Sequence, residues 1–161
     1  AGLRIKDGVI EFIPGNKAAS PYCDLSKDST EWQQAETSKG PVRANVECGE
    51  ITITDAVAAD DYEPNYDGVR IEELEVKLSE IPQVLKDLGI IPDKRAEEEG
   101  KTYVYFDATE GEYLPVRGSA FISTSNSGPS ALGLGSPRSS SYGDVGFRSA
   151  FYEVNGKLIT E

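Results

Sequence analysis

The chain has 161 residues, of which 38% are hydrophobic and 27% are charged, and its formal net charge is −12. This length suits one domain with a hydrophobic core, or one domain with a small appendage. No apolar run approaches the roughly 18 residues of a membrane-spanning helix, and an acidic surface repels both nucleic-acid phosphates and anionic membranes. The sequence therefore argues against nucleic acid and membrane as partners.

Charge is unevenly distributed along the chain. Residues 1–111 hold 24 acidic and 12 basic residues, whereas residues 112–161 hold four of each. The acidic surplus therefore belongs entirely to the first part. We accordingly divide the chain into an acidic, β-rich N-terminal part (1–111) and a neutral C-terminal part (112–161). The first part serves attachment or oligomerisation, or it forms the first half of a single domain.

Cysteine and histidine usage limits the available chemistry. The two cysteines, Cys23 and Cys48, match no zinc or redox motif, and the sequence leaves open whether they form a disulfide. The chain has no histidine, which removes the commonest general base, a common metal ligand and the Ser/His and Cys/His nucleophile systems. We therefore expect no enzyme activity, no catalytic residue, no metal site and no cofactor.

The first 41 residues predict a hairpin followed by polar chain. Apolar residues recur along 3–13, and Asp7-Gly8 is a strong signal for a two-residue turn. Residues 29–36 are compatible with either a short helix or a long loop. Trp32, the only tryptophan, is expected to be a packing anchor rather than a ligand platform.

An acidic stretch follows the next predicted strand. Residues 50–54 alternate and are β-branched, which is typical of a strand. The carboxylates of residues 59–68 could bind a hard cation, but their spacing is not that of an EF-hand loop. An acidic turn with two packed tyrosines is the favoured interpretation.

The chain then predicts a strand, a helix and another strand. Residues 69–78 alternate as a strand does, and residues 101–108 form a second such segment. Between them, Ser79 is expected to cap a helix over 80–88, and Gly89 is expected to end it. One helical face should be buried, formed by Ile81, Val84, Leu85 and Leu88.

The stretch from Leu114 to Tyr152 is the most distinctive part of the sequence. Near its start, an arginine, a glycine and small residues precede an aromatic residue, and residues 145–152 alternate as a half-buried strand should. Between these ends, serine, glycine, asparagine and proline dominate, which is the composition of loops. A rigid frame around polar loops suits recognition better than catalysis.

Four motifs occur in this stretch in a fixed order: Arg117-Gly118-Ser119-Ala120-Phe121, Gly128-Pro129-Ser130-Ala131-Leu132-Gly133-Leu134, Pro137-Arg138-Ser139 and Gly146-Phe147-Arg148-Ser149-Ala150-Phe151. Together they resemble the C-terminal core of C-type-lectin-like domains of the formylglycine-generating-enzyme (sulfatase-modifying-factor) type. The likeness is greatest to the short versions in phage proteins and in the variable proteins of diversity-generating retroelements.

The resemblance implies an α+β fold. Residues 112–161 would form a C-type-lectin-like core with antiparallel strands and few short helices, preceded by the β-rich N-terminal part. It also implies a structural role, such as holding irregular loops in place, for Arg117, Gly118, Arg138, Gly146, Phe147 and Arg148.

The resemblance further implies a ligand surface without catalysis. The enzymes of the family use cysteines in the C-terminal core, and residues 49–161 contain none. In the retroelement-diversified relatives, residues between the fixed motifs face solvent and bind ligands. The matching positions here are Phe121, Ser123, Thr124, Ser125, Asn126, Leu134, Ser136, Ser140, Ser141 and Tyr142.

These observations favour a non-enzymatic, virion-associated protein, such as a capsid decoration, collar, tail or fibre component, that binds a host receptor or glycan. One alternative is a secreted or surface bacterial lectin-like protein, and another is a purely structural capsid-stabilising protein. The expected partners are other virion proteins and further copies of this chain, and the expected location is the virion.

Overall fold

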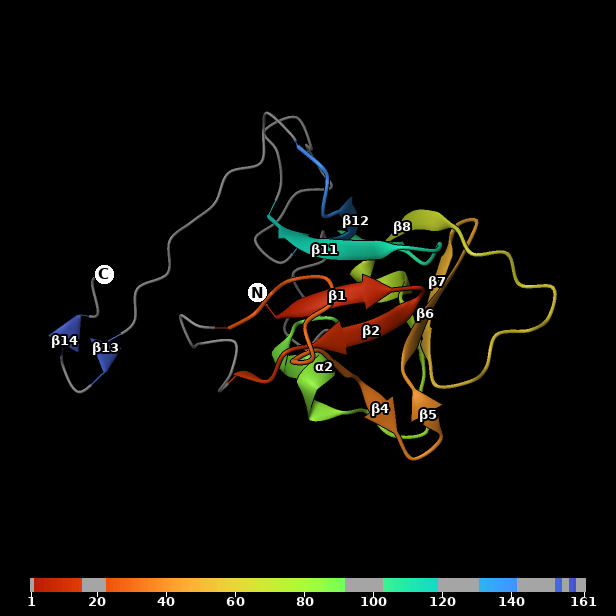
Figure 1. Cartoon of the computed structure of the whole chain (residues 1–161). Coiled ribbons are helices and arrows are strands. Elements are labelled where there is room, and N and C mark those ends of the chain that lie inside the picture. The colour runs from red at the N-terminus through yellow and green to blue at the C-terminus, as the bar shows by residue number, and fades with distance from the viewer. Residues whose placement is uncertain are drawn as a thin grey trace.

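The computed structural model describes residues 2–15, 23–91, 103–118 and 131–141, and the backbone of the strands at 153–154 and 157–158. These residues form mostly β structure, dominated by a sheet of ten strands (Figure 1). Its strands are β1 (Leu3–Lys6), β2 (Val9–Phe12), β3 (Gln33–Gln34), β6 (Arg43–Glu47), β7 (Glu50–Thr54), β8 (Tyr66–Arg70), β9 (Glu75–Lys77), β10 (Tyr103–Asp107), β11 (Glu112–Arg117) and β12 (Leu132–Pro137).

The strands are ordered β8-β10-β12-β11-β1-β2-β6-β7-β9, with β3 paired to β2. Pairing is antiparallel except between β10 and β12 and between β7 and β9. Two smaller sheets pair β4 (Glu36–Thr37) with β5 (Gly40–Pro41), and β13 (Glu153–Val154) with β14 (Lys157–Leu158).

Two local predictions are confirmed. Strands β1 and β2 form the predicted hairpin, in which Leu3 pairs with Phe12. Its turn residues Asp7 and Gly8 have φ of 49° and 77°, the two positive values of a type I′ turn. The alternating segment at 50–54 is β7, as expected.

The sheet curls around one hydrophobic core. Strand β8, at one end of the strand order, lies against β6 and β7 near the other end (Figure 1). The enclosed side chains form a single cluster, drawn from strands throughout the sheet and from the segment after β9. Its fully buried members include Ile5, Ile10, Val46, Ile53, Leu85, Ile90, Val104, Phe106, Leu132 and Leu134.

The predicted helix is shorter than expected. Helix α2 spans Gln83–Asp87, and the only other helical element with described bounds is a 3-10 turn, η1 (Ile71–Glu73). Gly89 has φ of 62°, which confirms it as the residue that ends the helix. The prediction that Ser79 caps the helix is wrong, because its backbone N–H and its hydroxyl both donate to Asp55.

The buried face of this helix is only partly as predicted. Leu85 is fully buried, and Val84 and Leu88 pack against the core. Ile81 is 46% exposed, because the helix starts after Pro82 and Ile81 lies in the irregular segment before it. Residues 29–36 contain turns and short strands rather than a helix, so the loop alternative is the correct one there.

The predicted α+β class, with a C-type-lectin-like core in residues 112–161, is wrong. Strands β11 and β12 lie in the middle of the large sheet, between β1 and β10 from the N-terminal part. Period-two alternation of apolar residues dominates the described chain, and this pattern favours strands. The resulting architecture is mostly β, with five residues in α2 and three in η1 among the described segments.

Both parts of the chain contribute to the same sheet and core. Ile5 of β1 pairs with Tyr113 of β11, and Leu132 and Leu134 belong to the same buried cluster as Val104. The boundary at residue 112 therefore does not separate two cores within the described segments. Among these residues, no helix is long and apolar enough to span a membrane.

Candidate functional site

Most of the ligand-binding residues predicted from the resemblance lie outside the described segments. These are Phe121, Ser123, Thr124, Ser125, Asn126 and Tyr142, and the same holds for the structural candidates Gly146, Phe147 and Arg148. Of the remaining positions, Ser136 on β12 and Ser140 after it are half-buried, and Ser141 is exposed.

Leu134 is not a surface residue, which corrects the expectation that it belongs to a ligand surface. It lies on β12 with none of its surface exposed, in register with Phe106 of the parallel neighbour β10. Because alternate residues of a strand face opposite sides, Leu132 and Leu134 face the core, and Gly133 and Gly135 face outward.

A buried network of two arginines and two glutamates connects the two parts of the chain. Arg4 donates from Nε to Glu11 at 2.7 Å and from Nη1 to Glu112 at 2.6 Å. Arg138 donates two further hydrogen bonds to the Glu112 carboxylate, from Nε to Oε2 at 2.8 Å and from Nη2 to Oε1 at 3.0 Å. The side chains of Arg4 and Glu112 are only 3% and 4% exposed, whereas that of Arg138 is 40% exposed.

The loop before β3 covers this network. The Trp32 ring lies 4.2 Å from the Arg4 guanidinium carbon, and its Nε1–H donates to the Ser26 carbonyl at 3.0 Å. Arg4 also donates to the Lys27 carbonyl at 2.9 Å. Trp32 therefore packs over a desolvated cation, as expected of a packing anchor.

The network holds Glu112 in its charged form. The hydrogen bonds from Arg138, supported by those from Arg4, lower the pKa of Glu112 to about 2 against the opposing effect of burial. Because Arg4 and Arg138 both donate to its carboxylate, Glu112 connects β11 to β1 and to the end of β12. The carboxylate is therefore structural rather than catalytic.

Arg117 and Gly118 lie where β11 ends. The Arg117 guanidinium donates to the Leu88 carbonyl at the end of α2, and burial lowers the pKa of Arg117. Gly118 has φ of 88°, a conformation that disfavours side chains. This contact joins β11 to the helical segment.

A second polar cluster surrounds Asp55, at the end of β7. One of its carboxylate oxygens accepts hydrogen bonds from Ser79 N–H at 2.9 Å and Thr37 Oγ1 at 2.7 Å, as well as from the Ser79 hydroxyl. The bonds from Ser79 and then Thr37 lower the pKa of Asp55 to about 2. Asp55 thus ties the segment before α2 to β4.

We expect acid to weaken the hydrogen bonds from Ser79 and Thr37 to Asp55 and so to destabilise the fold. A carboxyl group whose folded-state pKa is depressed stabilises the fold above its unfolded pKa, here near 3.8, and loses that effect as the pH falls toward about 2. The free energy of unfolding should therefore fall between these values, and Asp55→Asn should show a shallower fall and a lower stability at pH 7. Urea titrations at stepped pH measure both, and parallel curves for the two proteins would contradict the assignment.

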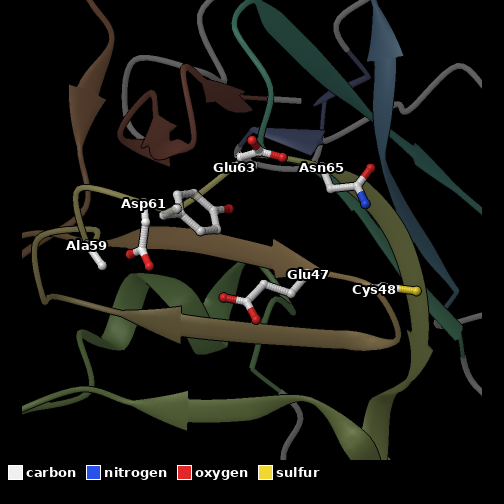
Figure 2. A pocket seen from close by; sticks show the side chains of 7 residues that line it. Glu47, Cys48, Ala59, Asp61, Glu63 and Asn65 are labelled. Carbon is white, nitrogen blue, oxygen red and sulfur yellow. The ribbon is translucent and has the colours of Figure 1, made fainter.

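A hollow of about 400 Å³ lies beside the β6–β7 turn, lined by Glu47, Cys48, Ala59, Asp61, Tyr62, Glu63 and Asn65 (Figure 2). Within the described ranges, no three Cys, Asp or Glu side chains are grouped to hold a metal ion. The Tyr62 hydroxyl instead accepts from the Val46 N–H at 2.8 Å and anchors the loop to β6. Cys23 and Cys48 are both free thiols, so the disulfide alternative is not what the structure shows.

The outer face of β8, β10 and β12 carries three tyrosines, which we call the tyrosine row: Tyr103, Tyr105 and Tyr66. The Tyr103 and Tyr105 ring centroids are 5.8 Å apart with planes inclined by 27°, and those of Tyr105 and Tyr66 are 6.4 Å apart and inclined by 17°. Tyr66 is 51% exposed, and Tyr103 and Tyr105 are half-buried. The row is therefore a nearly parallel set of rings on the surface opposite the core.

Glycines on the neighbouring strands let these rings lie against the sheet. Gly68 of β8 pairs with Tyr105, and a Cβ at Gly68 would overlap the Tyr105 ring. A Cβ at Gly135 of β12 would lie 2.5 Å from the Tyr66 ring. The Tyr105 and Tyr66 rings thus occupy space that a side chain would fill if either glycine were another residue.

Charged groups border the tyrosine row at both ends, and Glu72 and Glu73 lie beside the cation at one of them. Arg70 pairs with Tyr103 at one end, and Asp107 pairs with Tyr66 at the other. The hydrogen bond with Tyr103, supported by the charge of Glu72 at 3.7 Å, raises the pKa of Arg70. The Asp107 Oδ1 accepts from the Thr109 N–H at 3.0 Å and from its hydroxyl at 2.6 Å.

Sequence reasoning missed this face, although a signal for it exists. Tyr-Val-Tyr at 103–105 and Leu-Gly-Leu-Gly at 132–135 both alternate with period two. If these segments are adjacent strands with Tyr105 opposite Gly133, the aromatic rings and the glycines share one face. The pairing of β10 with β12 supplies that adjacency, and it is not readable from either segment alone.

Comparison with known proteins adds no relative to this description. No protein-family model matches the chain, and a search of curated proteins also finds no match.

Proposed function

We propose that this protein is a non-enzymatic binding protein, displayed on a virion, that attaches to a receptor or glycan on a cell surface through the tyrosine row. The observation that carries the proposal is the set of three near-parallel, stacked tyrosine rings on the outer face of the sheet, with Tyr66 51% exposed. Tyrosines provide large, rigid and amphipathic contact area at low cost in conformational entropy, which is why binding surfaces use them.

The rest of the molecule supports a role in display. The sheet supports the row rigidly, because the residues between the tyrosines, Val104 among them, belong to the core. The sequence has no histidine for general acid–base catalysis, and its net charge of −12 disfavours nucleic acid and anionic membranes. The virion placement is supported only by the resemblance of the motifs at 117–151 to those of short phage proteins.

The test is attachment of protein-coated beads to a panel of intact bacterial cells, since multivalent display reveals weak single-site binding. Two aromatic contacts are worth about 0.5–1.5 kcal/mol each, and about 1.4 kcal/mol is tenfold in affinity. The double variant Tyr66→Ala/Tyr105→Ala should therefore reduce attachment by roughly tenfold or more.

The matched control is Tyr66→Phe/Tyr105→Phe, which keeps both rings and should retain most of the attachment. Unfolding curves of each variant show whether the sheet is intact. If wild-type beads attach to no cells, the proposal is contradicted, and a purely structural role becomes the better interpretation. Equal attachment by the alanine and wild-type proteins would place binding elsewhere on the molecule.

A further inference from the structure

The hairpin of β13 and β14 forms a small sheet of its own. Its strands pair with Glu153 opposite Leu158 and Val154 opposite Lys157, and neither strand joins the ten-stranded sheet. Figure 1 shows this hairpin apart from that sheet. A two-stranded hairpin is only marginally stable in water, whereas three or more strands can be stable together. The hairpin therefore gains stability if it pairs with further strands.

Backbone geometry identifies the free edge of β14. The pairing of Val154 with Lys157 leaves Asn155 and Gly156 as a two-residue loop, a length and sequence typical of tight hairpins. The pair that flanks such a loop exchanges backbone hydrogen bonds, so the N–H and C=O groups of Lys157 face β13. Those of Leu158, the next residue, face the opposite side, and no described strand pairs with β14 there.

The sequence from Lys157 to Glu161 is self-complementary in charge. It starts with a cation and ends with an anion, and Leu158, Ile159 and Thr160 lie between them. If two copies of this segment pair antiparallel about Ile159, Lys157 lies opposite Glu161 of the partner subunit, and the reverse pair repeats it. Opposite charges at directly paired positions stabilise antiparallel strands.

The same register satisfies the free edge of β14. With Ile159 at the centre, Leu158 lies opposite Thr160 of the partner subunit. These are the residues whose backbone groups face away from β13 if the strand continues regularly to Glu161, so they form hydrogen-bonded pairs between the copies. Charge and hydrogen bonding thus select one register.

The distribution of charge favours a second copy as the partner. The acidic surplus belongs to residues 1–111, so the bodies of two copies repel each other, whereas residues 157–161 carry one charge of each sign. A basic partner would be attracted to the acidic body rather than to this balanced segment. A second copy instead presents the matching cation and anion at the matching positions.

We infer that the chain forms a two-fold dimer through residues 157–161, in which two hairpins join into one four-stranded sheet ordered β13-β14-β14-β13. The contact uses the same surface on both copies, as a two-fold interface requires. It assigns self-association to the C-terminal hairpin rather than to residues 1–111. The inference goes beyond the proposed function and does not depend on it.

The test is size-exclusion chromatography of the full-length protein with light scattering, over a wide range of concentration. Physiological ionic strength shortens the range of the repulsion between the bodies. With rising concentration, the mass of the wild type should approach twice the 17.4 kDa of one chain. Lys157→Glu and Glu161→Lys each place like charges opposite one another at both pairs, so each should weaken the dimer about tenfold or more.

Exchanging the charges tests the register. The double variant Lys157→Glu/Glu161→Lys restores both opposite-charge pairs and should recover the dimer. An equimolar mixture of the two single variants should also dimerise, because the two acidic positions of one then meet the two basic positions of the other. Glu63→Lys makes the same charge change at an exposed residue of the body and should leave the dimer unchanged.

Three results would each overturn the inference. The first is a wild type that stays monomeric at every concentration. The second is a dimer that neither single charge reversal weakens, which would place the contact elsewhere. The third is a double variant that stays as weak as the single variants. Urea unfolding of each variant shows that the ten-stranded sheet is intact, so a lost dimer cannot be attributed to a lost fold.

Discussion

Glu112→Gln should lower the free energy of unfolding by about 3 kcal/mol, since removing one partner of a buried ion pair leaves an uncompensated charge. The change keeps the size of the side chain but removes the charge that Arg4 and Arg138 share. Glu11 still pairs with Arg4, which keeps the loss at the lower end of the usual range. Urea unfolding at pH 7, with the m-value compared between proteins, measures the effect.

Two control variants separate burial from charge. Glu75→Gln breaks an ion pair with Lys77 whose side chains are 55% and 66% exposed, and it should cost less than about 1 kcal/mol. Arg138→Gln removes the exposed end of the buried network and should cost less than Glu112→Gln does. If Glu112→Gln and Glu75→Gln cost the same, the network contributes no more than a surface pair and its structural role is refuted.

The pH dependence of the wild type should report on the same carboxylate. The folded-state pKa of Glu112 is about 2, below the 4.5 of an ordinary glutamate, so its stabilising effect is complete above pH 4.5 and is lost as the pH falls toward 2. Glu112→Gln lacks this titrating group and should lose less stability over that interval than the wild type does.

Local chemistry made part of the fold predictable. Asp7-Gly8 identified a turn because only a few residues tolerate two successive positive φ angles, and the pattern of residues 50–54 identified β7. Gly89 ended the helix for the same conformational reason. Each of these predictions depends on residues within about one turn or strand of one another.

Long-range pairing was not predictable from the sequence. Arg4 and Glu112 are 108 positions apart, and no local pattern indicates that they meet. The same is true of the pairing of β10 with β8, which brings the three tyrosines together, and of β10 with β12, which places Gly135 near Tyr66. The glycines at 133 and 135 suggested loop chemistry, whereas on β12 they are the outward positions of a strand and leave room there for neighbouring rings.

Leu134 shows how the neighbouring strand can reverse a conclusion about burial that was drawn from local sequence. In a serine- and glycine-rich stretch, a leucine between two glycines resembles an isolated apolar residue on a loop surface. In the sheet, the glycines face outward and Leu134 enters the core beside Phe106. The sequence Leu-Gly-Leu-Gly at 132–135 is therefore compatible with a loop or with a buried strand, and the neighbouring strand decides between them.

Leu134→Ala should accordingly destabilise the protein by about 3 kcal/mol, within the usual range for truncating a fully buried leucine. Leu25→Ala is the matched control because Leu25 is 44% exposed, and it should change stability by no more than about 0.5 kcal/mol. Urea unfolding of both variants against the wild type measures the difference. A cost for Leu134→Ala as small as that of the control would place Leu134 on the surface. It would also contradict the outward orientation of Gly135, which leaves room for the Tyr66 ring.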